Sequence, residues 1–158
     1  MPSDRVIEKG DFVLMDYGAG YCDYRSDMTR TVVMGEPTQE QLDLYALVRR
    51  THEECVAAIH PGVEGNDIYK LSKKIIGDAG YGDYYNHGLG HGVGIDIHEL
   101  PNFNRSKNTI EIGSVVTMEP GVYLPGVGGV RLEDYGVVTE NGYEPFTKTP
   151  HDLHVIDC

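Results

Sequence analysis

Residues 87–99, which read HGLGHGVGIDIHE, place the strongest constraint on how this chain can fold. The stretch holds three histidines and four glycines within an apolar run that includes Val93, Ile95 and Ile97. Glycine inside a strand often marks a bulge or a point where backbone or ligand must approach closely. Imidazoles clustered on such a strand favour a metal or catalytic site over the alternative, a flexible surface loop. The rest of the chain is then expected to bring oxygen ligands to this strand.

Size and composition indicate one globular domain spanning residues 1–158. Of its 158 residues, 40% are hydrophobic and 24% are charged, which allows a real core and argues against disorder. A formal net charge of -12, without a basic cluster, argues against nucleic acid as a partner. No stretch approaches the roughly 20 apolar residues that cross a bilayer, and the N-terminal residues lack the apolar core of a signal peptide. We therefore expect a cytoplasmic protein with no membrane partner, in which Cys22, Cys55 and Cys158 are free thiols.

The order of the sequence patterns predicts an α+β fold, with helices covering one face of a mostly antiparallel sheet. Strands are expected at 12–19, 28–35, 114–124 and 129–139, and helices at 38–59 and 66–79. At the start of the first helix, Thr38 and Gln41 form a capping-box pattern. The second helix is expected to begin at Asn66 and to end where Gly80 supplies a left-handed cap.

Several carboxylates lie inside or at the head of the apolar strand runs, at Asp16, Asp27, Glu119 and Glu133. An ionised carboxylate in such a setting is costly unless it is paired or bound to a cation. Each has an ordinary structural interpretation when taken singly, such as an ion pair between Glu119 and Arg131. Together with His91 they form a set of five ligands on separate strands, which indicates a dinuclear metal centre. Oxygen ligands with one imidazole suit manganese, iron, cobalt or zinc.

Four segments closely resemble the proline-specific branch of the pita-bread metallopeptidases, which holds Xaa-Pro dipeptidases (prolidases) and Xaa-Pro aminopeptidases. They are DYGAGYCDYRSDMTRT (16–31), HGLGHGVGIDIHELP (87–101), TMEPGVYLPG (117–126) and GGVRLEDYGVVTENG (128–142). The resemblance implies a pita-bread fold and hydrolysis of Xaa-Pro bonds in dipeptides or at peptide N-termini, with a metal-bridging hydroxide as nucleophile. It also implies two divalent metal ions, with manganese expected first, and a peptide or dipeptide substrate. Dipeptidase and aminopeptidase activity both remain open.

The same resemblance implies a role for each ligand position. Asp16 resembles the terminal aspartate on one metal, and Asp27 and Glu133 resemble the carboxylates that bridge both metals. His91 resembles the single imidazole ligand on the other metal, with Glu119 as its carboxylate companion. Glu119 is also expected to shuttle a proton from water to the leaving amine.

Other residues of these motifs are expected to surround the metals. His98 resembles the substrate-side histidine that binds the carbonyl or the developing oxyanion, and His87 either supports the site or is merely structural. Arg131 either orients a ligand carboxylate, anchors the substrate terminus or forms a plain ion pair. Tyr123 is either a wall of the site or a core residue. The remaining histidines lie outside any motif and are expected to be surface or packing residues: His52, His60, His151 and His154.

The chain departs from the full family pattern before the strand that holds Asp16. Full members carry a further segment there, with another substrate-side histidine, so we expect an N-terminally truncated catalytic domain. Apolar surface would then be buried by a homodimer or by a missing N-terminal segment or chain, and activity alone is expected to be weak or absent. Two alternatives are a non-catalytic peptide-binding module and a metal-free hydrolase similar to creatinase. The five retained ligand positions argue against both.

Overall fold

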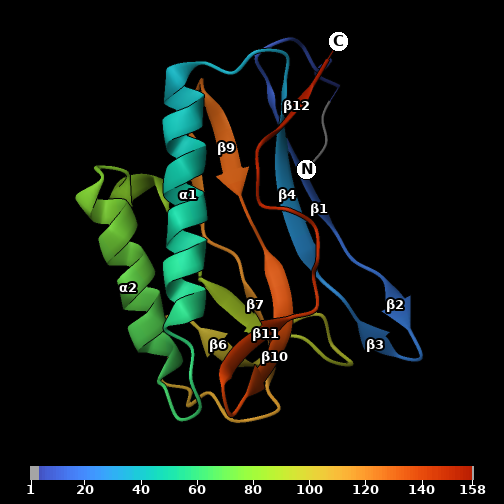
Figure 1. Cartoon of the computed structure of the whole chain (residues 1–158), viewed down its shortest axis with the longest axis vertical. Helices are drawn as coiled ribbons and strands as arrows, with labels where there is room; N and C mark the ends of the chain where they lie inside the picture. The colour runs from blue at the N-terminus through green and yellow to red at the C-terminus, as the bar shows by residue number, and fades with distance from the viewer. Residues whose placement is uncertain (1–3, 158) are drawn as a thin grey trace.

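Two helices stand on one side of the molecule and a set of short strands on the other (Figure 1). The computed structural model describes residues 4–157. In chain order the elements are β1 (Phe12–Tyr17), β2 (Gly20–Tyr21), β3 (Tyr24–Arg25), β4 (Met28–Met34), α1 (Gln39–Ala57), α2 (Gly65–Asp78), a short 3-10 turn η1 (Gly82–Tyr84), β5 (Gly90–Gly92), β6 (Glu99–Phe103), β7 (Val115–Met118), β8 (Gly121–Leu124), β9 (Gly128–Arg131), β10 (Asp134–Thr139), β11 (Gly142–Pro145) and β12 (His154–Ile156).

The strands form two main sheets that meet at one point. The larger has five strands in the order β11-β10-β7-β5-β6, and the smaller has the order β1-β4-β12. Within the described residues, the named strands pair antiparallel except β12, which runs parallel to β4. An isolated bridge between Thr29 of β4 and Glu133, just before β10, joins the two sheets. The expected mostly antiparallel α+β fold is therefore confirmed.

Helix α1 begins and ends close to its expected limits. Thr38 Oγ1 accepts a hydrogen bond from the Gln41 backbone N–H, and the Gln41 side chain accepts one from the Thr38 backbone N–H, so the capping box is present. Helix α2 begins one residue before its expected start, with Glu64 at the N-cap, and Gly80 follows it with a φ of +88°. A left-handed residue at this position closes a helix with little steric cost only when it is glycine.

Two apolar clusters hold the helices against the sheets. The first joins α1 and α2 to the five-stranded sheet, with Cys55, Ile68 and Phe103 among its buried members. The second joins the N-terminal part of α1 to β8 and β9, with Leu44 and Val122 among its members. Because α1 contributes to both, it fixes the β8–β9 pair relative to the large sheet. No helix in the described part of the chain combines the length and apolarity needed to span a membrane.

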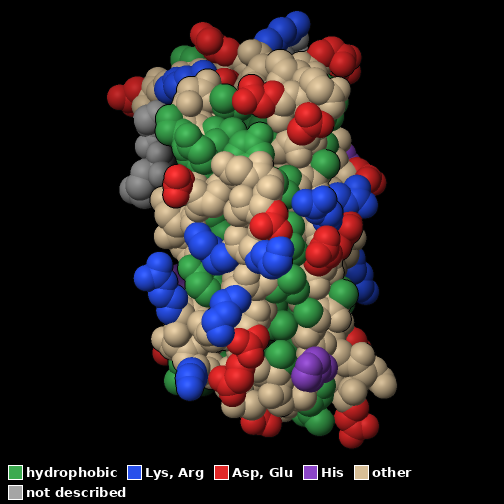
Figure 2. Space-filling model, turned by 90° about the vertical axis from the view of Figure 1, so that its left-hand side faces the viewer, with side chains coloured by type: hydrophobic (Ala, Val, Ile, Leu, Met, Phe, Trp, Pro, Cys, Tyr) green, Lys and Arg blue, Asp and Glu red, His purple; other side chains and the backbone are tan. Residues whose placement is uncertain are grey.

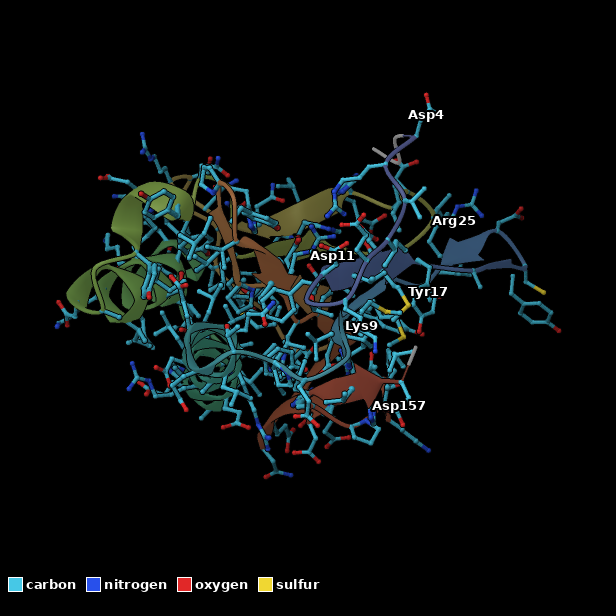
Figure 3. The ribbon with its side chains drawn as sticks, turned by 90° about the horizontal axis from the view of Figure 1, so that it is seen from above. Asp4, Lys9, Asp11, Tyr17, Arg25 and Asp157 are labelled. Carbon is cyan, nitrogen blue, oxygen red and sulfur yellow. The ribbon has the colours of Figure 1, made fainter. Side chains whose placement is uncertain are left out.

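The outer surface carries charges of both signs. On the helical face, Lys and Arg side chains lie among Asp and Glu side chains (Figure 2). Away from the helices, the β2–β3 hairpin extends beyond the sheets, with Arg25 on it and Tyr17 at its base (Figure 3). Its turn uses a positive φ at Cys22 and Asp23. The long turn expected between the first two strands is thus a small hairpin.

The histidine-rich stretch differs from the expected strand. Only Gly90–Gly92 is a strand, and the residues from 93 to 98 form an irregular loop before β6. Ile95 and Ile97 are 62% and 37% exposed, so they do not continue a buried apolar run. The short strand lies between β6 and β7, where a Cβ at Gly90 would overlap the Thr117 carbonyl. Close backbone packing, rather than side-chain burial, explains the glycines. Cys22 is an exposed and Cys55 a buried free thiol, whereas Cys158 lies outside the described residues.

Candidate metal centre

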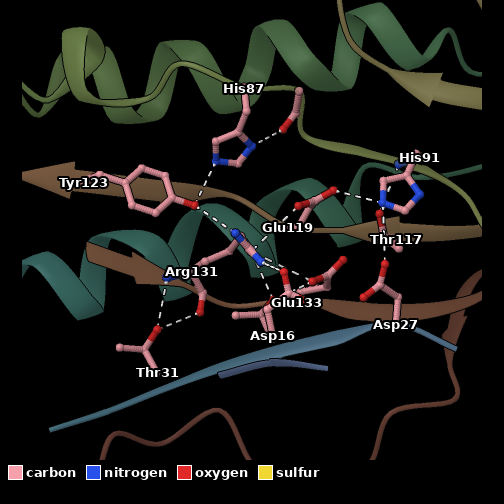
Figure 4. Close-up of polar contacts among 12 residues, drawn as sticks. Asp16, Asp27, Thr31, His87, His91, Thr117, Glu119, Tyr123, Arg131 and Glu133 are labelled. Carbon is pink, nitrogen blue, oxygen red and sulfur yellow. Dashed lines mark hydrogen bonds and ion pairs between the residues drawn. The ribbon is translucent and has the colours of Figure 1, made fainter. Parts of the chain in front are cut away.

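The acidic residues and His91 converge from separate elements at the junction of the two sheets (Figure 4). Asp16 lies on β1, Asp27 directly precedes β4, and Glu119 directly follows β7. Glu133 lies between β9 and β10, and His91 is the central residue of β5. The expected ligand positions, which are far apart in the sequence, are therefore brought together.

Three of these side chains, Asp27, His91 and Glu133, have ligand atoms that all lie within 4.8 Å of one another. The His91 Nε2 atom lies 3.3 Å from Glu119 Oε1 and 3.7 Å from Asp27 Oδ2. The His91 Nδ1 atom lies 3.0 Å from its neighbour's carbonyl, to which it donates. With its proton on Nδ1, the ring has a free lone pair on Nε2, and this atom is directed at the carboxylates. A metal-binding imidazole needs this tautomer.

Backbone and hydroxyl contacts fix the orientation of these side chains. The Thr29 hydroxyl donates to Glu133 Oε2 at 2.6 Å, and the His91 amide donates to Thr117 Oγ1 at 3.0 Å. Neither threonine was expected from the sequence to have a role at the site. The contact between Thr29 and Glu133 spans 104 positions, so no local pattern predicts it. The only sequence signal for Thr29 is its place two residues after Asp27.

Arg131 links the carboxylates to the wall of the site. Its guanidinium bonds to Asp16, and its Nε atom lies 3.8 Å from Glu119 Oε2 and 3.9 Å from Glu133 Oε2. Its Nη1 atom donates to the Tyr123 hydroxyl at 3.2 Å. These contacts fit two of the three interpretations left open for Arg131, orientation of a ligand carboxylate and a plain ion pair.

The hydrogen-bond chain continues from Arg131 through Tyr123 to His87. The Tyr123 hydroxyl lies 3.3 Å from His87 Nε2, and His87 Nδ1 lies 2.7 Å from the Gly88 carbonyl. Because Nδ1 donates to the carbonyl, Nε2 accepts from tyrosine, so each member of the chain has a partner. Arg131, Tyr123 and His87 are therefore linked in one hydrogen-bonded chain beside the carboxylates.

A cavity of about 630 Å³ opens in front of the cluster. Its lining includes Asp16, Glu119 and Arg131 together with all three histidines of the stretch, His87, His91 and His98. The rings of His98 and His91 lie 4.2 Å apart between centroids, although His98 belongs to the irregular loop. Glu119 and His98 both face this cavity.

Burial controls the protonation of the cluster. Loss of solvent raises the pKa of Glu119 to about 7 and that of Glu133 to about 8, and the negative charge of neighbouring carboxylates adds to both shifts. Loss of solvent also raises the pKa of Asp27 and lowers that of His91. Such a crowded set of oxygen donors and one neutral imidazole is stabilised by divalent cations, which remove the repulsion. The residues present therefore fit the expected metals.

Comparison with known proteins agrees with this geometry. Residues 1–140 match the sequence model of metallopeptidase family M24. This chain belongs to metallopeptidase family M24. Among its relatives in the family, the Xaa-Pro dipeptidase of Pyrococcus furiosus is 45% identical over 152 residues, which cover 96% of this chain and 44% of that protein.

Solved structures of M24 relatives have the same fold. The prolidase from Pyrococcus horikoshii OT3 matches with a TM-score of 0.93 and 42% identity, over 96% of this chain and 44% of that one. The X-Pro aminopeptidase from Thermotoga maritima MSB8 matches with a TM-score of 0.94 and 35% identity, over 98% and 44% of the two chains. The expected pita-bread fold is confirmed. The chain spans less than half the length of these relatives.

Proposed function

We propose that this chain carries the catalytic machinery of a dinuclear metallopeptidase that hydrolyses Xaa-Pro bonds in dipeptides or at peptide N-termini. The observation that carries the proposal is the convergence of Asp27, His91 and Glu133 within 4.8 Å beside a cavity lined by Glu119 and His98. Dipeptidases and aminopeptidases specific for Xaa-Pro bonds among the similar proteins support the substrate class. A non-catalytic binding module would not need these buried, mutually repelling carboxylates.

In this proposal two divalent ions are held by five side chains. Asp16 would hold one ion and His91 with Glu119 the other, and Asp27 and Glu133 would be shared between them. Manganese is the first candidate, with cobalt, zinc and iron as alternatives, since all accept oxygen and imidazole ligands. When bound, the pair of ions supplies an acidified water and polarises the scissile carbonyl.

The chain's own residues perform the proton transfers and orient the substrate. Glu119 takes the proton from the attacking water and delivers it to the leaving nitrogen. His98 donates to the oxyanion that develops on the carbonyl. Arg131 holds Asp16 in place, and His87 with Tyr123 forms the wall behind the substrate.

The substrate preference has a chemical reason. A bond before proline is a tertiary amide without an N–H group. A peptidase that positions its substrate through that N–H group cannot hold this bond, so a dedicated pocket is required. The proposal therefore predicts faster cleavage of an Xaa-Pro dipeptide than of the matching Xaa-Ala dipeptide.

The metal centre is tested first by titrating the metal-stripped chain with manganese, cobalt and zinc in a calorimeter. We expect high-affinity sites for two ions, both lost in Asp27→Ala and in Glu133→Ala, because each variant removes a bridging ligand. Unchanged binding in both variants would contradict the assignment of the ligands.

Hydrolysis is tested with Glu119→Gln, which keeps the shape of the side chain but cannot accept a proton. We expect this variant to lose roughly 100-fold or more of the Xaa-Pro cleavage rate. The rate of the unaltered chain is itself expected to be low, as the chain spans less than half the length of its relatives. Cleavage that continues undiminished in Glu119→Gln would contradict the proposed proton shuttle.

A further inference from the structure

A second cluster of metal-ligating side chains lies apart from the five expected ligands. It consists of His52 on α1, Asp134 at the start of β10, and His151 in the segment between β11 and β12. Asp134 Oδ2 lies 2.7 Å from His151 Nε2 and 3.5 Å from His52 Nε2. Helix α1 contacts the segment that holds His151, since Tyr45 donates to the His151 carbonyl and Arg49 to Asp152. The cluster therefore joins three elements that are distant in the sequence.

His52 has an unusual environment for a core histidine. The residue is 2% exposed, yet neither ring nitrogen has a hydrogen-bond partner. A buried polar atom without a partner costs about 1–3 kcal/mol, so most such atoms in folded proteins are paired. The Nε2 atom is directed at Asp134 Oδ2 but lies too far away for a good hydrogen bond. The interpretation of His52 as an ordinary packing residue leaves this unexplained.

We propose that His52, Asp134 and His151 form a third metal site, for a zinc ion, separate from the dinuclear centre. Two imidazoles and one carboxylate are a common donor set for zinc with an open fourth position. Tetrahedral zinc with bonds of about 2.0–2.1 Å places its ligand atoms about 3.3 Å apart. The His52 to Asp134 distance already matches, and the hydrogen bond between His151 and Asp134 must open by about half an ångström.

Two features of the cluster favour metal entry and binding. The side chain of His151 is 24% exposed, so water and an ion can reach the cluster from that side. His52 is buried with both ring nitrogens unpartnered, so one of them has a lone pair to offer an ion. The two imidazole rings lie 4.8 Å apart between centroids, at an interplanar angle of 73°.

Arg30 is the group that opposes a cation at this place. Its Nη2 atom donates to Asp134 Oδ1 at 2.7 Å, which leaves Oδ2 to face the histidines. Its other donors contact backbone carbonyls, at Thr29, Glu133, Thr149 and Pro150. Arg30 thereby fixes the orientation of the carboxylate, as partners of metal-binding carboxylates commonly do. Its positive charge also predicts that zinc binds here more weakly than at the dinuclear centre.

The test is a zinc titration of the metal-stripped full chain, with stoichiometry from calorimetry and the melting temperature as a second measurement. We expect three zinc ions per chain, two in His151→Gln and in His52→Gln, and one in Asp27→Ala. In the Asp27→Ala background, the remaining ion should raise the melting temperature, and adding His151→Gln should abolish that rise. This second comparison remains valid whether or not the dinuclear centre forms.

The control is His154→Gln, which removes an exposed histidine three residues further along the chain, at the start of β12. It should bind as much zinc as the unaltered chain. His52 is buried, so His52→Gln can fail to fold. His151 is partly exposed, so His151→Gln then tests the zinc site by itself. Equal zinc binding and equal melting shifts with and without His151 would overturn the proposal, as would an equal loss in His154→Gln.

Discussion

The protonation of Glu119 and Glu133 connects the metal centre to pH. Burial and mutual repulsion hold their pKa values at about 7 and about 8 in the metal-free protein. Both groups are therefore mostly protonated at pH 6, whereas a metal ion binds only the carboxylate form. Metal binding must then expel these protons.

We predict that filling the centre with manganese at pH 6 releases roughly two protons per chain. The number of protons released is obtained by comparing the binding enthalpies measured by calorimetry in two buffers that differ in ionisation enthalpy. Glu133→Gln has no proton to lose at that position, so any ion that it still binds should release about one proton fewer. Metal binding without proton release would show that the carboxylates are already ionised.

The same shifts predict how the stability of the metal-free protein depends on pH. A carboxyl group whose pKa is raised by folding stabilises the folded state below its unfolded pKa, here 4.5, and loses that contribution as the pH rises through the folded pKa. The free energy of unfolding should therefore fall between pH 6.5 and 8.5. The lowered pKa of His52, about 4, affects stability only below about pH 6.5, outside this window.

Urea unfolding of the metal-stripped protein at several pH values between 6.5 and 8.5 measures this fall. Glu133→Gln should flatten the curve, because it removes the group with the pKa of about 8. A stability that rises across this window would contradict the assigned protonation. Saturating manganese should reverse the trend, since ions that bind the ionised carboxylates stabilise the folded state.

At the scale of elements, β5 depends on its glycines. A Cβ at Gly90 would overlap the Thr117 carbonyl of β7, so Gly90→Ala must push β5 away from β7 and displace His91. We predict a loss of about 2 kcal/mol or more in stability, as is usual for overpacking against a rigid neighbour, and weaker manganese binding. Urea unfolding and a manganese titration measure the two effects.

Gly77 in α2 supplies the matched control. A Cβ there would meet nothing within 4 Å, and the residue lies inside a helix, so Gly77→Ala should raise stability by about 0.5–1 kcal/mol. Manganese binding should not change. Equal effects of the two substitutions would mean that β5 can shift freely, against the packing described above.

The sequence predicts elements well where one local rule decides them. The capping box at Thr38 and the left-handed Gly80 each act within a few residues, and both helices follow. The histidine-rich stretch was predicted less well, because alternating apolar residues favoured a strand through Ile97. Its short strand is instead limited by contacts with β6 and β7, which no local pattern contains.

The candidate site divides in a similar way. The carboxylates and His91 of the candidate site could be predicted to lie together because they stand in distinctive motifs, the carboxylates inside or at the head of apolar strands and His91 in the glycine-rich stretch. The cluster of His52, Asp134 and His151 could not, because no motif surrounds either histidine and only tertiary packing joins α1, β10 and the C-terminal segment. Thr29 lies within a quoted motif, but it was missed because its contact with Glu133 spans 104 positions of the sequence.

At the scale of the whole molecule, Arg30 holds together the parts that meet at the metal centre. Its side chain is 5% exposed and bridges β4, the Glu133 carbonyl, Asp134 and the carbonyls of residues 149 and 150. The smaller sheet, the larger sheet and the C-terminal segment are thus joined by one guanidinium group. Its planar fork is needed because a lysine ammonium cannot reach acceptors in so many directions.

We predict that Arg30→Lys lowers the free energy of unfolding by about 2–4 kcal/mol, because it leaves buried carbonyls and Asp134 without partners. It should also weaken manganese binding, since the Glu133 backbone loses its anchor. The matched control is Arg49→Lys. Arg49 also contacts the C-terminal segment, through Asp152, but its side chain is 40% exposed. That exposed pair should contribute less than about 1 kcal/mol. If both variants lose the same small amount of stability and bind manganese equally well, Arg30 does not connect the sheets to the metal centre in the way its contacts indicate.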